Sequence, residues 1–137
     1  MKPAQRRLKS ALIAIVLLCI PFPQAFAQTQ ASAIPLIIVP TKIDFGPQPM
    51  NSESRPVTIT ITNRASTPVT LEEILSSGID FSLQNNCGKQ LAPGTGCSVQ
   101  ISFTPAIAGD RTGILQITAS DSASSHFIPL SGIGTGQ

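Results

Sequence analysis

Apolar and polar residues alternate with a period of two over most of the chain. In residues 57–63, VTITITN, the aliphatic side chains fall on one side and the threonines on the other. Residues 97–104, CSVQISFT, repeat this alternation, and their apolar side is formed by Cys97, Val99, Ile101 and Phe103. Because successive side chains of a β-strand point to opposite faces, both segments are predicted to be strands with one buried face.

Five further segments show the same alternation, and turn-forming residues separate them: 41–45, 68–75, 79–83, 112–119 and 126–131. In 79–83 the apolar side would be Ile79, Phe81 and Leu83. Seven short strands, each with one apolar face, predict an all-β fold, an immunoglobulin-like β-sandwich of about seven antiparallel strands. A barrel is the alternative. The predicted core residues are Phe45, Ile59, Ile61, Phe81, Val99, Ile101, Phe103, Leu115, Ile117 and Leu130.

The first 27 residues have the pattern of an export signal. A basic start precedes an apolar run over residues 10–20, and Ala25-Phe26-Ala27 forms an A-x-A cleavage site. The rival interpretation is a membrane anchor, but the run is about half of the ~20 residues that a spanning helix needs. We therefore expect a signal peptide over residues 1–27 and a mature chain that is secreted to the periplasm or the cell exterior, with no stable membrane span.

Residues 28–40 form a leader in which Pro35 and Pro40 bracket the apolar run LIIV. The leader is expected either to add a short edge strand or to remain loose, and the domain itself is expected over residues 41–137. Four basic residues and no acidic ones lie in the signal, so the mature part carries 5 basic and 7 acidic residues, a net charge of −2. Its basic residues are scattered singly, which argues against nucleic acid as a partner.

Two cysteines, Cys87 and Cys97, remain after removal of the signal, which takes Cys19 with it. An even pair in an exported chain favours a disulfide, which would stabilise the fold by about 3 kcal/mol. A metal site and a reactive thiol are the alternatives. Zinc needs about four ligands, whereas only His126 could join the two cysteines as a nitrogen ligand, and no helix is predicted near either thiol to activate it.

A set of spaced positions resembles a known family. The set comprises Cys87, Leu91, Pro93, Gly94, Cys97, Val99, Ile101, Phe103, Pro105, Gly109, Arg111, Gly113, Leu115 and Ile117, ending in Leu130-Ser131-Gly132-Ile133-Gly134. This pattern is similar to the bacterial ASH or Hydin-type immunoglobulin-like domain of exported choice-of-anchor D proteins, which is related to major sperm protein and PapD-like sandwiches. The resemblance covers about 95 residues. It implies a non-catalytic β-sandwich that serves as a spacer or binding module.

The candidate catalytic residues do not form a recognisable motif. His126 is the single histidine and is expected at the start of a strand, and no G-x-S-x-G motif surrounds any serine. Asp44, Asp80, Asp110 and Asp121 fall near strand ends, where carboxylates could gather around Ca²⁺, although turn formation is the simpler explanation. Arg111 is expected to pair across the sheet, to cap a loop carbonyl, or to be a solvated strand residue. We expect no enzyme activity, no cofactor and no bound metal.

These observations predict an exported structural or protein-binding module that acts in the bacterial cell envelope or outside the cell. Its expected partners are other envelope or extracellular proteins. The alternative is a PapD-like chaperone, or a subunit of a surface fibre, in which the apolar leader donates a strand to a neighbour. A catalytic role would require His126 to lie beside a carboxylate and a hydroxyl in one pocket.

Overall fold

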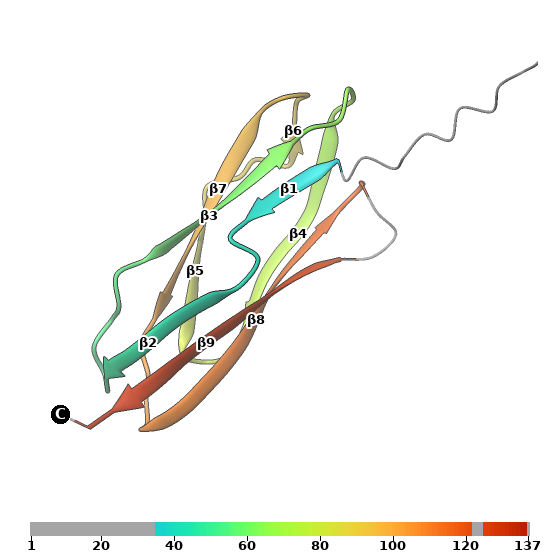
Figure 1. The fold of residues 1–137 in the computed structure, drawn as a ribbon. Helices are drawn as coiled ribbons and strands as arrows, with labels where there is room; N and C mark the ends of the chain where they lie inside the picture. The colour runs from blue at the N-terminus through green and yellow to red at the C-terminus, as the bar shows by residue number, and fades with distance from the viewer. Residues whose placement is uncertain (1–34, 122–124, 137) are drawn as a thin grey trace, which may run out of the picture.

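A computed structural model describes residues 35–121 and 125–136, and these residues form two β-sheets packed face to face (Figure 1). The four-stranded sheet has the order β1 (Leu36–Val39), β3 (Val57–Asn63), β7 (Gly96–Phe103) and β5 (Phe81–Asn85). The five-stranded sheet has the order β2 (Ile43–Pro49), β9 (His126–Thr135), β8 (Gly109–Ala119), β4 (Val69–Ser77) and β6 (Gln90–Leu91). The predicted signal peptide lies outside the described residues.

The predicted immunoglobulin-like β-sandwich is confirmed, but the described part of the chain forms nine strands and includes one parallel pair, β2 with β9. The parallel pair arises because the chain leaves the four-stranded sheet after β1 and crosses to the other sheet at residues 40–42, so no hairpin sets the direction of β2. β6 has only two residues, too few to show an alternation in the sequence. In the leader, residues 36–39 form an edge strand, which was one of the two expected outcomes.

The core lies between the sheets and is almost entirely aliphatic. Nine of the ten predicted core residues are buried, and Phe45 is partly buried against them. The rings of Phe45, Phe81 and Phe103 meet with centroids 5.0 to 5.9 Å apart. Three aromatic rings in contact fill the space between the two sheets where the rest of the core offers only smaller side chains.

The prediction that Ile79 faces the core is wrong. Its side chain is 91% exposed, and strand β5 begins two residues later, at Phe81. Gly78 has a φ of 95°, and the Phe81 N–H donates a hydrogen bond to the Gly78 carbonyl at 3.1 Å. This turn interrupts the alternation, so Asp80 is buried in place of Ile79.

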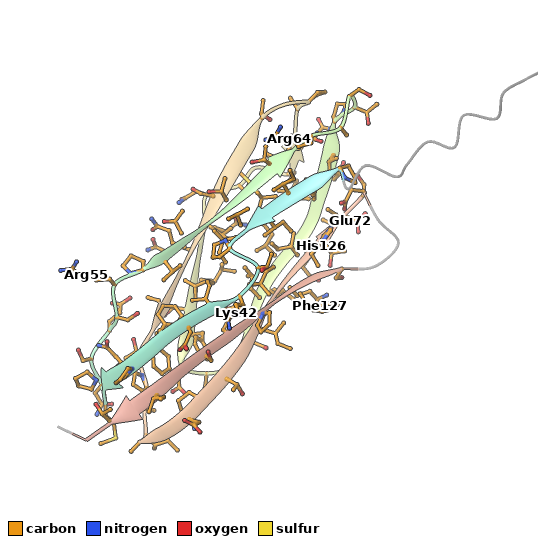
Figure 2. All side chains as sticks on the ribbon, in the orientation of Figure 1. Lys42, Arg55, Arg64, Glu72, His126 and Phe127 are labelled. Carbon is orange, nitrogen blue, oxygen red and sulfur yellow. A yellow bond between two sulfur atoms is a disulfide. The ribbon has the colours of Figure 1, made fainter. Side chains whose placement is uncertain are left out.

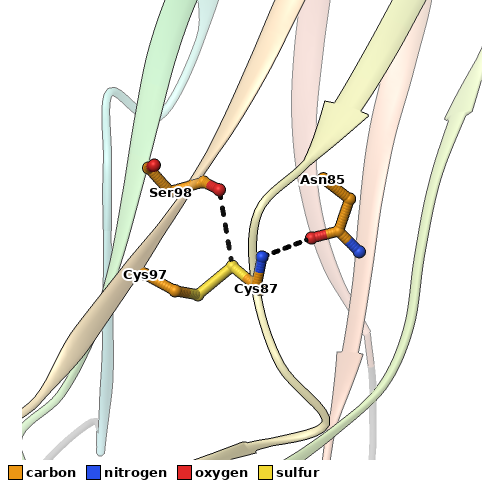
Figure 3. Close-up of a disulfide and its surroundings, with 4 residues drawn as sticks. All are labelled: Asn85, Cys87, Cys97 and Ser98. Atoms are coloured by element: carbon orange, nitrogen blue, oxygen red, sulfur yellow. Dashed lines mark hydrogen bonds between the residues drawn. A yellow bond between two sulfur atoms is a disulfide. The ribbon is translucent and has the colours of Figure 1, made fainter.

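Cys87 and Cys97 form a disulfide, which decides between the three alternatives (Figure 3). The bond joins Cys97 on β7 to Cys87, which follows β5, with the Cα atoms 5.1 Å apart. Both residues are half-buried and pack against the core. The Cys87 N–H donates to the Asn85 side-chain oxygen at 2.8 Å, which fixes the turn leading out of β5. None of the described residues form a helix long and apolar enough to cross a membrane.

Candidate functional site

An apolar groove of about 500 Å³ opens between β1 and the beginning of β9. It is lined by Leu36, Ile37, Ile38, Thr41, His126, Phe127 and Ile128. No lining residue is an aspartate, glutamate, lysine or arginine, and only His126 can titrate. In Figure 2, His126 and Phe127 lie at the start of β9, on the side of the molecule that carries β1. A surface of this composition suits an uncharged, apolar partner.

The groove is bounded by two strand edges that carry unpaired backbone groups. Among the strands of residues 35–121 and 125–136, β1 is the outermost of its sheet and pairs with β3 alone. On the other side, β2 covers β9 only from the pair Ile43–Leu130 onward, so residues 126–129 are paired with β8 but not with β2. Backbone N–H and C=O groups along such edges are available to an added strand.

Alternation along each strand places apolar side chains at the surface as well as in the core. Leu36 is buried, whereas Ile37 and Val39 point outward and are 40% and 56% exposed. On β9, Ile128 is buried and its neighbour Phe127 is 60% exposed. Outward positions of a sandwich strand are normally polar, so the exposed Ile37 and Phe127 at the groove, with Val39 farther along β1, form an unusual surface.

Phe127 also borders a second hollow, of about 260 Å³, on the outer face of the five-stranded sheet. This hollow is lined further by Leu75, Ser76 and Ser77 of β4 and by Ile114 and Gln116 of β8. Leu75 and Phe127 lie on either side of Gln116 in the strand register. The apolar surface therefore continues from the edge of β1 across Phe127 to the middle of the outer face.

His126 begins β9, as predicted, and its ring lies beside a carboxylate. Nε2 is 3.1 and 3.2 Å from the two carboxylate oxygens of Asp121, which is buried. Thr41 contributes a hydroxyl to the same groove. A catalytic triad also needs the histidine to contact the nucleophilic hydroxyl, and no hydrogen bond between His126 and a hydroxyl is present among residues 35–121 and 125–136. The condition for a catalytic role is thus met only in part.

The four aspartates near strand ends do not gather. Asp44 accepts a hydrogen bond from the Gly46 N–H at 3.0 Å, which is turn chemistry, and Asp121 contacts His126. Within the described part of the chain, no group of three or more His, Cys, Asp or Glu side chains is placed to hold a metal ion.

Asp80 and Arg111 form an ion pair at the opposite end of the sandwich from the groove. The Asp80 carboxylate also accepts the Ala106 N–H at 3.0 Å, and its backbone carbonyl accepts the Thr104 N–H at 2.8 Å. Burial by itself raises the pKa of Asp80, but the hydrogen bonds from Arg111 and Ala106 and the charge of Arg111 outweigh it. The net effect is a pKa below the ordinary value of 3.8. Arg111 is therefore paired rather than solvated, but its partner lies in the turn before β5 of the other sheet and not across its own sheet.

Asn63, at the end of β3, is a polar residue that was not predicted to be buried. Its side-chain nitrogen donates to the carbonyls of Thr67 and Leu91 at 2.9 and 3.0 Å, and its oxygen accepts the Ala65 N–H at 2.9 Å. These bonds hold the turn after β3 against β6. The available signal was an asparagine at an inward position of an alternating strand.

The fold is shared with several solved structures. The ASH / PapD-like domain of human CEP192 matches with a TM-score of 0.64 at 15% identity, over 96% of this chain and 99% of that chain. The secreted serine protease VesC from Vibrio cholerae matches with a TM-score of 0.59 at 20% identity, over 75% of this chain and 24% of the protease. The periplasmic chaperone SfaE matches with a TM-score of 0.53 at 12% identity, over 74% of this chain and 58% of the chaperone. At these identities the likeness concerns the fold alone.

A search of the curated proteins finds no match. The model of the family described as "Abnormal spindle-like microcephaly-assoc'd, ASPM-SPD-2-Hydin", or ASH, matches residues 35–127. This match covers more than half of the 137 residues and includes both cysteines and eight of the nine strands in full. The resemblance found in the sequence is confirmed, and the chain belongs to the ASH family.

Proposed function

We propose that the chain is an exported, non-catalytic module that binds other proteins of the bacterial cell envelope or the cell exterior by accepting a strand at the free edge of β1. The observation that carries this proposal is the combination of that edge with the apolar groove beside it. Added strands gain affinity from main-chain hydrogen bonds and specificity from pockets for alternate side chains. Here the free edge of β1 would supply the main-chain hydrogen bonds, and the groove would supply the pockets for side chains.

A comparison of the four sheet edges supports β1 as the binding edge. β2 carries Pro47 and Pro49 and an irregular register between Asp44 and Pro47, and β6 is only two residues long. β5 presents the polar residues of FSLQN. Prolines, irregularities, short length and polar residues are features that protect sheet edges from unwanted pairing. β1, LIIV, is short but has neither charge nor proline within it.

Export is supported by the predicted signal and by the disulfide, since such bonds persist mainly in oxidising compartments. A non-catalytic role is supported by the incomplete contact of His126 with any hydroxyl of the groove. The strand-donating alternative is less favoured, because β1 is already paired with β3 and Leu36 is part of the core. Donation would therefore remove a strand from this chain's own sheet.

The proposal is tested by site-specific photo-crosslinking in the cells that produce the protein. A photoreactive amino acid is placed at position 37 in the full chain, and in a control at position 133. Ile133 is a matched control because it is also an outward-facing strand isoleucine, with 42% exposure against 40% for Ile37. We expect adducts from position 37 and none from position 133. Equal adducts at both positions, or none at position 37, would contradict strand binding at β1.

Export is tested separately by N-terminal sequencing of the mature protein from the periplasm or the medium. A mature chain that begins at Gln28 is the expected result. Recovery of the intact N-terminus from the cytoplasm would contradict it.

A further inference from the structure

We infer that the strand accepted at this edge is β1 of a second copy of the same chain, so that two molecules pair antiparallel about a two-fold axis. The inference rests on the proposed function, because it names the partner for the same edge. In the pair, the two four-stranded sheets would join through β1 into one continuous sheet. Each copy would then cover the groove and the exposed Phe127 of its partner.

The chemistry of the edge is self-complementary. In a two-fold contact each residue meets the same surface on the other copy, so a charge near the axis would face an identical charge. Residues 36–39 carry no charge, and with the two-fold axis at Ile38 the outward side chain of Ile37 in one copy would face Val39 of the other. Cross-strand pairs of β-branched side chains stabilise antiparallel pairing. An edge designed for an unlike partner would more often carry charges that select it.

The exposed apolar surface at the edge supplies most of what a stable dimer needs. A standard interface buries about 800 Å² on each partner, of which roughly 57% is apolar, or about 450 Å². Three large exposed side chains border the edge: Ile37, Val39 and Phe127. Their exposed fractions correspond to roughly 300 Å², within the range of the largest apolar patch on a typical monomer.

The prolines on either side of β1 limit how the copies can pair. Proline has no backbone N–H to donate, so Pro35 and Pro40 end the ladder at both ends of LIIV. Four residues span about 13 Å at ~3.3 Å per residue, and this short ladder confines the register. The backbone contact is therefore too short to hold two chains alone, and side-chain contacts at Ile37, Val39 and Phe127 must contribute.

The test is sedimentation equilibrium of the purified mature chain with its disulfide intact, from about 1 to 200 μM, a range that brackets ordinary micromolar association. We compare the unchanged chain, Ile37→Lys and the matched control Ile133→Lys. We expect a dimer for the unchanged chain and for Ile133→Lys. For Ile37→Lys we expect a dimer dissociation constant at least tenfold larger. In that variant a charged lysine of each copy would lie against the apolar Val39 of the other copy, next to the axis.

Far-ultraviolet circular dichroism and the unfolding midpoint verify that each variant is folded. Val39→Lys serves as a second variant, because Val39 is more exposed and its replacement disturbs the core less. It is expected to dissociate in the same way. A dimer as tight in both lysine variants as in the unchanged chain would overturn the inference, because the contact would then lie elsewhere.

A monomeric unchanged chain at every concentration would also overturn the inference. The crosslinking experiment then separates the two claims. Adducts at position 37 with a protein of different mass would leave strand binding at β1 supported and exclude the second copy as partner. A monomer that also gives no adduct at position 37 would overturn both.

Discussion

Gly132 on β9 lies directly against the ring of Phe103, and this contact gives a sharp test of the packing. A Cβ added at Gly132 would lie 2.7 Å from Cζ and 2.8 Å from Cδ1 of that ring, closer than carbon atoms can approach. Phe103 has no exposed surface and is held by Phe45 and Phe81, with ring centroids 5.6 and 5.0 Å away. The ring therefore has nowhere to move, and Gly132→Ala should strain the core.

The magnitude follows from two opposing effects. Overpacking a closed core by one methyl group costs about 1–3 kcal/mol. Replacing glycine with alanine also restricts the unfolded chain, which returns about 0.4–1 kcal/mol. We therefore expect Gly132→Ala to lower the free energy of unfolding by about 1–2 kcal/mol. Gly136→Ala is the matched control, since a Cβ there would meet nothing within 4 Å, and it should lie within about 0.5 kcal/mol of the unchanged chain.

Phe103→Leu separates the clash from other effects of the alanine. It removes the ring atoms that the added Cβ would meet and by itself should cost about 1–2 kcal/mol. In that background Gly132→Ala should cost much less, so the double variant should be more stable than the sum of the single effects by about 1 kcal/mol. Urea unfolding followed by circular dichroism gives all four free energies. Additive effects would refute the contact.

Three further predictions concern groups that hold the sandwich together. Replacing both Cys87 and Cys97 with serine should lower the free energy of unfolding by about 3 kcal/mol, the value for closing a loop of about ten residues; an unchanged melting temperature would be inconsistent with the native disulfide. Asn63→Ala should cost about 1–3 kcal/mol, because it leaves the carbonyls of Thr67 and Leu91 without their donor, and thermal unfolding measures it; an effect below about 0.5 kcal/mol would be evidence against these bonds. Asp80→Asn should cost about 3 kcal/mol near neutral pH, because it breaks a buried ion pair with Arg111. Since folding lowers the pKa of Asp80, the stability that this carboxylate contributes is present above pH 3.8, its ordinary pKa, and is lost as the pH falls through the pKa of the folded state. The urea midpoints of the variant and the unchanged chain should therefore converge below pH 3.8. A difference that stays constant with pH would contradict this account.

Local alternation determined most of what could be predicted. In a strand with one buried face, every second side chain is apolar and points to the core. Ile59, Ile61, Val99 and Ile101 could therefore be placed in the core without knowledge of the neighbouring strands. The disulfide was predictable for a different reason, since the expected removal of Cys19 with the signal leaves two of the three cysteines, and two cysteines allow one pairing. Ile79 shows the limit of this reasoning, because the turn at Gly78 places it before the strand and at the surface, whereas Phe81, the next residue of the pattern, stays in the core.

Only the tertiary structure decided which edges stay free and what lies beside them. β1 became an edge because it pairs with β3, and the groove formed because β2 leaves the first residues of β9 uncovered. Likewise the Asp80–Arg111 pair and the contact of Gly132 with Phe103 join residues from different strands. Alternation reports which face of a strand avoids water, but it carries no information about the neighbour in the sheet. That neighbour is selected by the hydrogen-bond ladders and side-chain packing of the assembled sandwich.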